Sequence, residues 1–138
     1  MTSKRRARLI TASALGLYLA QVYVRAGWGK LDGDPPWRVA FVGWGYPGWF
    51  RVLIGVVEVA GGVALLIPWI SSYGALALSL VMMGAWSTLA QDLRWKEMAA
   101  VAAYGLALGW IAREWWWLRL RHRPGIPHRI RRIQGWPP

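Results

Sequence analysis

The sequence contains no cysteine, two histidines and six acidic residues among 138. The absence of cysteine excludes disulfide bonds, thiolate metal sites and thiol redox chemistry in this chain. Both histidines, His122 and His128, lie near the C-terminus, so we do not expect a haem or chlorophyll held by histidine inside an apolar segment. The sequence therefore predicts no metal site and no cofactor attached through histidine or cysteine.

Charged residues are scarce and are segregated along the chain. They make up 17% of the sequence, whereas roughly a quarter is usual for a soluble domain. The formal net charge is nevertheless +11, and the excess positive charge lies at the two ends. A basic chain invites a nucleic-acid-binding interpretation, but membrane topology explains charge at the ends more directly. We therefore expect a membrane protein and no nucleic-acid partner.

Four segments are apolar and long enough to cross a bilayer, which takes about 20 residues. They run from about Leu9 to Gly27, Phe50 to Ile70, Ser71 to Ala90, and Met98 to Trp117. The expected fold is therefore all-α, a polytopic membrane protein with a bundle of four transmembrane helices. This bundle forms one domain over residues 1–118, and residues 119–138 form a basic, proline-containing tail.

The segment between the first two expected spans, from Trp28 to Trp49, is rich in tryptophan, proline and glycine. Its stretches 34–36 and 43–48 favour turns over regular structure. Indole rings prefer the headgroup level of a bilayer. We therefore expect a loop that lies half-inserted along the outer membrane interface.

The distribution of basic residues predicts the orientation. The two loops expected on the outer side carry no net charge. The basic residues gather in the N-terminus and in the tail, as Lys4, Arg5, Arg6 and Arg8, and as Arg119, Arg121, Arg123, Arg129, Arg131 and Arg132. The positive-inside rule then places both termini in the cytoplasm, as an even number of spans requires. We expect a multi-pass protein of the inner (cytoplasmic) cell membrane, whose tail arginines anchor to anionic lipid headgroups.

Glu58 is the most informative single residue. It lies about eight residues into the second span, roughly 12 Å from its outer end, where a carboxylate is costly unless it is paired, hydrated or protonated. Arg25 is the expected partner, and Gln21 and Arg51 extend the polar cluster. Two interpretations stay open: the Glu58–Arg25 pair locks two helices in register, or it borders a site for a quinone headgroup or a proton-coupled ligand.

Small residues indicate close packing of helices. Gly105 and Gly109 form a Gly-x-x-x-Gly pair in the fourth span, and Gly61 and Gly62 follow Glu58 in the second. Such residues let helices approach each other closely, either within this chain or against a partner subunit.

Several short motifs occur in a characteristic order. The run Gly27-Trp28-Gly29-Lys30-Leu31 closes the first span, Pro47 precedes the second, and Glu58 is followed by Gly61-Gly62. In these residues the chain resembles the DoxX-like family of small four-helix membrane proteins, related to the DoxD subunit of thiosulfate:quinone oxidoreductase. The family-like positions are Gly27, Lys30, Pro47, Glu58 and Gly62. The resemblance implies an accessory membrane subunit associated with redox enzymes and quinone chemistry.

Three functions are compatible with these features. The leading one is a noncatalytic accessory subunit of a larger membrane bioenergetic complex, redox or photosynthetic, packed against other transmembrane subunits. The alternative is the membrane subunit of a quinone-linked oxidoreductase, with Glu58 and Arg25 near the quinone. The third is a small homo-oligomeric transporter. It is the least favoured, because a single acid–base pair offers few polar groups to line a transport pathway. No catalytic residue is evident, so we do not expect catalysis by this chain alone, and a quinone or a lipid is the expected bound molecule.

Overall fold

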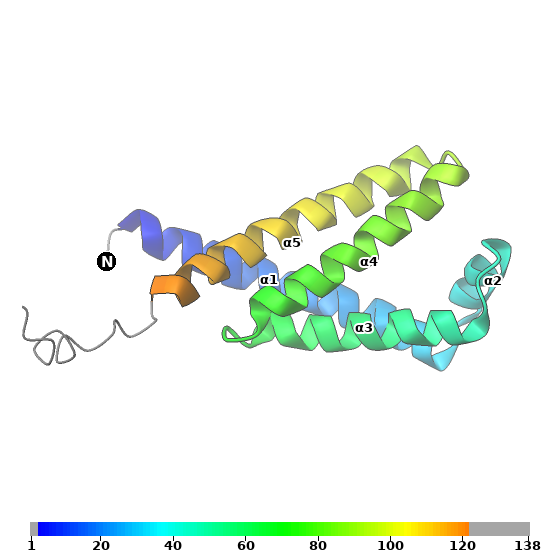
Figure 1. Ribbon diagram of the computed structural model, residues 1–138, viewed down its shortest axis with the longest axis horizontal. Helices are drawn as coiled ribbons and strands as arrows, with labels where there is room; N and C mark the ends of the chain where they lie inside the picture. Colours follow the sequence, from blue (N-terminus) through cyan, green and yellow to red (C-terminus); the bar gives the residue numbers. More distant parts are fainter. Residues whose placement is uncertain (1–2, 122–138) are drawn as a thin grey trace, which may run out of the picture.

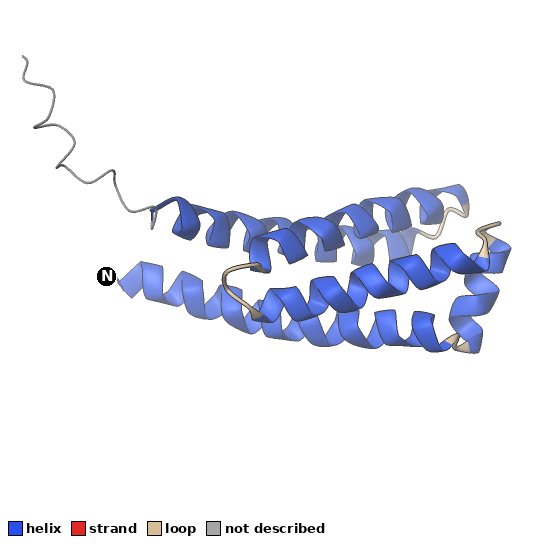
Figure 2. Ribbon diagram, turned by 60° about the horizontal axis from the view of Figure 1, so that its bottom comes forward, coloured by secondary structure: helices blue, strands red, loops and turns tan. Residues whose placement is uncertain are grey.

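The computed structural model describes residues 3–121 of the chain. This part is helical and contains no strand (Figures 1 and 2). Its five helices are α1 (Ser3–Asp32), α2 (Pro35–Gly43), α3 (Gly48–Leu66), α4 (Ser71–Gln91) and α5 (Trp95–Arg121). The all-α expectation is confirmed for the described residues.

The long helices α1, α3, α4 and α5 run alternately in opposite directions, and the short α2 lies across one end of them (Figures 1 and 2). α1 packs along α3, α4 packs along α5, and the contact between α3 and α4 joins these two pairs. The pairs diverge toward the end where α2 lies (Figure 1). The start of α1 and the end of α5 lie together at the opposite end, so the described part of the chain begins and ends on the same side of the bundle.

Three of the helices are long and apolar enough to cross a membrane. They are α1, over Arg6–Asp32, α3 and α4. α5 forms over the fourth expected span, but Arg113 and Glu114 interrupt its apolar run, and the count of four spans stays a prediction. Apolar side chains such as Leu80 on α4 (69% exposed) and Leu106 on α5 (77% exposed) cover the outside of the bundle, which suits contact with lipid chains.

Glycines set the distance between α1 and α3. A Cβ on Gly27 would lie 2.7 Å from the carbonyl oxygen of Gly55, and a Cβ on Gly55 would lie 2.9 Å from that of Gly27. One on Gly62 would lie 2.9 Å from Val24 Cγ2. Because real Cβ contacts are essentially never this short, the two backbones can approach so closely only through glycine.

Glycine also allows the close contact between α3 and α4, whereas the glycines of α5 make no close contact. A Cβ on Gly61 would lie 2.7 Å from Leu78 Cγ of α4. On α5, a Cβ at Gly105 would meet Met82 at an ordinary 3.8 Å, and nothing lies within 4 Å of Gly109. The tight contacts between the long described helices are therefore made by glycines of α1, α3 and α4, such as Gly27, Gly61 and Gly74. The Gly-x-x-x-Gly pair of α5 leaves room for side chains.

The segment between α1 and α3 is more regular than its composition predicts. α1 continues past Gly27 to Asp32, because packing against α3 outweighs the low helix propensity of glycine. Gly33, whose φ is +80°, follows its last residue and turns the chain away from the helix. α2 follows, with prolines in its first turn, where a missing N–H costs nothing. Turns occupy only the short links on either side of α2, and the half-inserted position of the segment stays a prediction.

The last described residues of the chain are helical. α5 runs to Arg121, so Arg119 and Arg121 belong to its last turn. The other four arginines that were expected to anchor the tail lie outside the described residues, namely Arg123, Arg129, Arg131 and Arg132.

Candidate ligand-binding site

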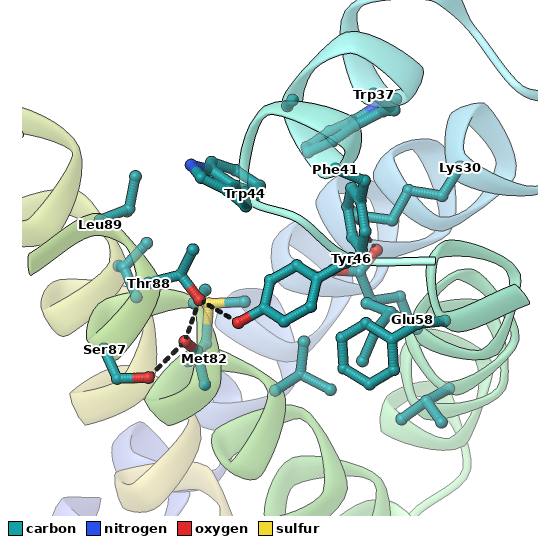
Figure 3. Close-up of a pocket in the computed structure, with 18 of the residues that line it drawn as sticks. Lys30, Trp37, Phe41, Trp44, Tyr46, Glu58, Met82, Ser87, Thr88 and Leu89 are labelled. Atoms are coloured by element: carbon teal, nitrogen blue, oxygen red, sulfur yellow. Dashed lines mark hydrogen bonds and ion pairs between the residues drawn. The ribbon is translucent and has the colours of Figure 1, made fainter. Parts of the chain in front are cut away.

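A pocket of about 740 Å³ lies between the two helix pairs at the α2 end of the molecule (Figure 3). Small-molecule sites typically have volumes of roughly 300–1,000 Å³. One wall comes from α1, α2 and α3, and the other comes from α4 and the start of α5. Most lining residues are apolar or aromatic; the polar ones are Lys30, Glu58, Ser87, Thr88, Arg94 and Glu97.

A buried ion pair forms part of the first wall. Lys30 Nζ donates a hydrogen bond to Glu58 Oε2 over 2.6 Å, and the two residues are 4% and 3% exposed. Side chains of a helix lean toward its N-terminus. Because α1 and α3 are antiparallel and touch at Gly27 and Gly55, Lys30 and Glu58, each three residues beyond its glycine, lean toward each other. The glycine contact therefore places the ion pair.

Trp37 of α2 covers this ion pair. Lys30 Nζ lies 3.5 Å from the centroid of the Trp37 ring, a cation–π contact that partly replaces the lost hydration of the ammonium group. Gly29 makes room for it: a Cβ there would lie 3.0 Å from Trp37 Nε1 and 2.7 Å from Asp34 Oδ2. The position of α2 thus depends on a glycine next to the lysine.

Aromatic rings line the pocket beside the ion pair. The Tyr46 and Phe50 rings lie 4.9 Å apart between centroids, and Phe41 lies 6.0 Å from Tyr46 and 6.3 Å from Phe50. Figure 3 shows Tyr46 extended across the pocket, with Glu58 behind it and Trp37 and Trp44 above. Flat, polarisable walls of this kind suit a ring-shaped ligand.

Two hydrogen bonds join the loop between α2 and α3 to the end of α4. Thr88 Oγ1 donates to the carbonyl oxygen of Gly84 over 3.0 Å, so the Tyr46 hydroxyl is the donor in its 2.9 Å bond to Thr88 (Figure 3). Trp44 Nε1 donates to Asp92 Oδ2, also over 2.9 Å. These contacts connect the two walls and close this side of the pocket.

Charged residues occur at the rim of the pocket, at the turn between α4 and α5. Arg94 Nη2 donates to Glu97 Oε1 over 2.8 Å in an exposed ion pair. A hydrogen bond from the backbone N–H of Glu97, helped by the Arg94 guanidinium, holds the pKa of this carboxyl below its usual value. Glu97 is therefore ionised at neutral pH, just before the apolar part of α5 begins.

The structure gives Glu58 a different partner from the one that the sequence favours. Arg25 and Gln21 are exposed, and no ion pair joins Arg25 to Glu58, although both are among the described residues. Gly27 and Lys30 mark the face of α1 that packs against α3. Arg25 precedes Gly27 by two residues, about 200° around the helix, and so points to the other side.

The family-like positions converge at the contact between α1 and α3. Gly27 and Gly62 lie where the two backbones approach, and Lys30 and Glu58 form the buried pair. Pro47 is the residue directly before α3, where it starts the helix. The pattern that resembles a family is thus also a structural unit.

Several residues of the site have no distinctive signal in the sequence. The pocket is lined by Trp37, Tyr46 and Thr88, among others. In the sequence, these residue types indicate only anchoring at the membrane interface or a position on a helix surface. Arg51, by contrast, is half-buried and makes no ion pair with Glu58; its guanidinium lies near Gly33. The spacing of Lys30 three residues after Gly27 is the one signal that places the lysine on the face toward Glu58.

The ion pair offers a hydrogen-bond donor and an acceptor side by side. Lys30 has three ammonium protons and uses one toward Glu58, and the second carboxylate oxygen of Glu58 is not used by this pair. Such a pair can donate a hydrogen bond to a carbonyl oxygen and accept one from a hydroxyl group. Within residues 3–121 no group of three His, Cys, Asp or Glu side chains gathers as a metal site.

Comparison with known proteins identifies the family. No curated protein and no solved structure matches the chain significantly. The model of the DoxX-like family matches residues 14–112, a range that includes α2, α3, α4 and every residue lining the pocket. With its apolar helices, this chain is a membrane protein and belongs to the DoxX-like family.

Proposed function

We propose that this chain is a noncatalytic membrane subunit that binds a quinone for a larger redox assembly. One observation carries the proposal: a pocket of about 740 Å³ with aromatic walls contains a buried Lys30–Glu58 pair. A charged pair in such a place is expensive to maintain. A role in ligand recognition explains why it faces a cavity instead of packed side chains.

The chemistry of the pocket matches that of a quinone. A quinone ring carries carbonyl oxygens that accept hydrogen bonds, and its reduced form carries hydroxyl groups that donate them. Lys30 supplies the donor and Glu58 the acceptor, so the same pair serves both redox forms. The rings of Tyr46 and Phe50 lie close enough to each other to form a flat face for the quinone ring.

Electron transfer in this proposal belongs to partner subunits. The chain has no cysteine, and its described residues offer no metal-binding group, so its own side chains are assigned binding and positioning. Other transmembrane subunits would pack against the apolar outer faces of the helices. A lipid chain in the pocket is the competing occupant, and it needs no hydrogen-bond donor at Lys30.

We place the protein in the inner cell membrane, with both of its termini in the cytoplasm. Because the chain lacks cysteine, single cysteines can report the orientation. Val39 of α2 is 72% exposed and Trp69 in the link between α3 and α4 is 81% exposed. A membrane-impermeant thiol reagent added outside should label Val39→Cys but not Trp69→Cys; the reverse pattern would overturn the orientation.

Filling the pocket tests the binding proposal. Gly84 lines the pocket, and a Cβ there meets nothing within 4 Å, as is also true of Gly109, which lies outside the pocket. Gly84→Phe should abolish saturable binding of decylubiquinone to the purified chain, measured by equilibrium dialysis, and Gly109→Phe should leave it intact. Equal binding by both variants would contradict the proposal.

A further inference from the structure

The corner where α1, α2 and α3 meet contains two arginines, Arg38 and Arg51, that form no ion pair within the described residues. Gly33 lies between them. A Cβ built on Gly33 would be 3.5 Å from Arg38 Cδ and 3.5 Å from Arg51 Nη2. The two side chains therefore approach the same point from α2 and α3. This corner is separate from the pocket, whose lining includes none of these three residues.

Arg51 lacks an acceptor for its guanidinium. Its Nη1 atom is buried and has no hydrogen-bond partner, and a charged donor left unsatisfied in this way is costly. The nearby acids do not supply the acceptor. Asp32 and Asp34 are exposed and form no ion pair, and Asp34 Oδ2 instead lies over Gly29.

The two guanidinium groups favour an anion beside Gly33, while the carboxylates of Asp32 and Asp34, its neighbours in the chain, are exposed. The first turn of α3 contains no acidic residue, and Arg51 adds its charge to the positive end of the dipole of this helix. Arg38 brings a second guanidinium to the same place. Two guanidinium groups with free donors match the oxygen atoms of a phosphate, which arginine binds through paired hydrogen bonds.

Exposed tryptophans show at which depth this corner lies. Trp28, near the end of α1, is 65% exposed, and Trp49, near the start of α3, is 67% exposed. Indole rings at the ends of apolar helices mark the headgroup level of a bilayer. We propose that Arg38 and Arg51 hold the phosphate group of an anionic phospholipid headgroup beside Gly33.

Native mass spectrometry of the full chain in a neutral detergent tests this site. The chain is titrated with phosphatidylglycerol, and in a parallel experiment with inorganic phosphate alone. Arg38→Gln/Arg51→Gln should bind phosphatidylglycerol at least about tenfold more weakly than the wild type. The affinity of Arg51→Lys should lie between those of the wild type and the double variant, because lysine keeps the charge but cannot form the paired hydrogen bonds of a guanidinium group. Arg25→Gln, which removes one positive charge from an exposed position on α1, should bind as the wild type does.

Each result of this experiment either supports the phosphate site at Arg38 and Arg51 or overturns it. Unchanged binding by the double variant, or an equal loss in Arg25→Gln, would overturn the site, since binding would then depend on overall charge. Arginine-dependent binding of inorganic phosphate that displaces the lipid would assign the site to free phosphate and overturn the lipid headgroup. Equal helix content by circular dichroism must accompany each comparison, and Arg51→Lys provides the test if the double variant does not fold.

Discussion

Replacing one member of the Lys30–Glu58 pair should destabilise the protein far more than replacing both. Lys30→Met leaves the Glu58 carboxylate, 3% exposed, without its partner at 2.6 Å. Breaking a buried pair in this way costs roughly 3–5 kcal/mol. Lys30→Met/Glu58→Leu removes both charges and keeps apolar stems of similar size. The double variant should therefore unfold with a free energy close to that of the wild type, or up to about 4 kcal/mol higher.

Reversible unfolding by a denaturing detergent in mixed micelles measures this difference. The 12 tryptophans report the transition by fluorescence. Arg25→Leu is the matched control: Arg25 is exposed on the opposite face of α1, so its replacement should change the free energy of unfolding by no more than about 0.5 kcal/mol.

Two results would refute the reasoning. If the double variant were as unstable as the sum of its single variants, the two side chains would not be interacting in the folded protein. If Arg25→Leu were as costly as Lys30→Met, Glu58 would have Arg25 as its partner, as the sequence alone suggests.

Three further predictions concern other parts of the site. Gly27→Ala should destabilise the bundle by about 1–3 kcal/mol, because the new Cβ would lie 2.7 Å from the Gly55 carbonyl oxygen; Gly109→Ala, with nothing within 4 Å, should not destabilise it in the same unfolding assay. Tyr46→Phe removes the hydrogen bond to Thr88, so it should cost about 1 kcal/mol and speed the dissociation of bound decylubiquinone in a stopped-flow experiment; an unchanged rate would exclude Tyr46 from closing the pocket. The pKa of Glu97 is lowered in the folded state by its backbone N–H and by Arg94, so its stabilising contribution is present at neutral pH and is lost as the pH falls through the lowered pKa. The protection factors of the amides at the turn between α4 and α5, which are corrected for the intrinsic exchange rate at each pH, should therefore fall in acid in the wild type, and Glu97→Gln should not show this acid dependence.

The apolar segments were sufficient to predict the helical fold. Runs without charge such as 71–91 predict α4 directly, because burying a polar backbone in lipid requires a helix. Neither α2 nor the extension of α1 beyond Gly27 could be predicted in this way. Proline and glycine weaken any local helix signal, so tertiary packing determines whether these residues are helical. Gly29 leaves room for the Trp37 ring, and Gly27 leaves room for the backbone of Gly55.

The candidate site was only half predictable for a similar reason. Glu58 stands out because it is an acid in an apolar span, and its position requires a partner. The choice between Arg25 and Lys30 depends on which face of α1 contacts α3, and that face is defined by glycine contacts between helices distant in sequence. Tyr46 and Thr88 come from different segments and meet only in the fold, so no local pattern links them.

The most direct test of the account is the binding of decylubiquinone to Lys30→Met/Glu58→Leu, compared with the wild type by equilibrium dialysis. The double variant keeps the fold and the apolar pocket but removes the donor and the acceptor. The account predicts that it remains as stable as the wild type and loses at least about tenfold in affinity, the equivalent of one charge-assisted hydrogen bond. Unchanged affinity in a stable double variant would contradict it, because the pocket would then bind the molecule through its apolar walls alone.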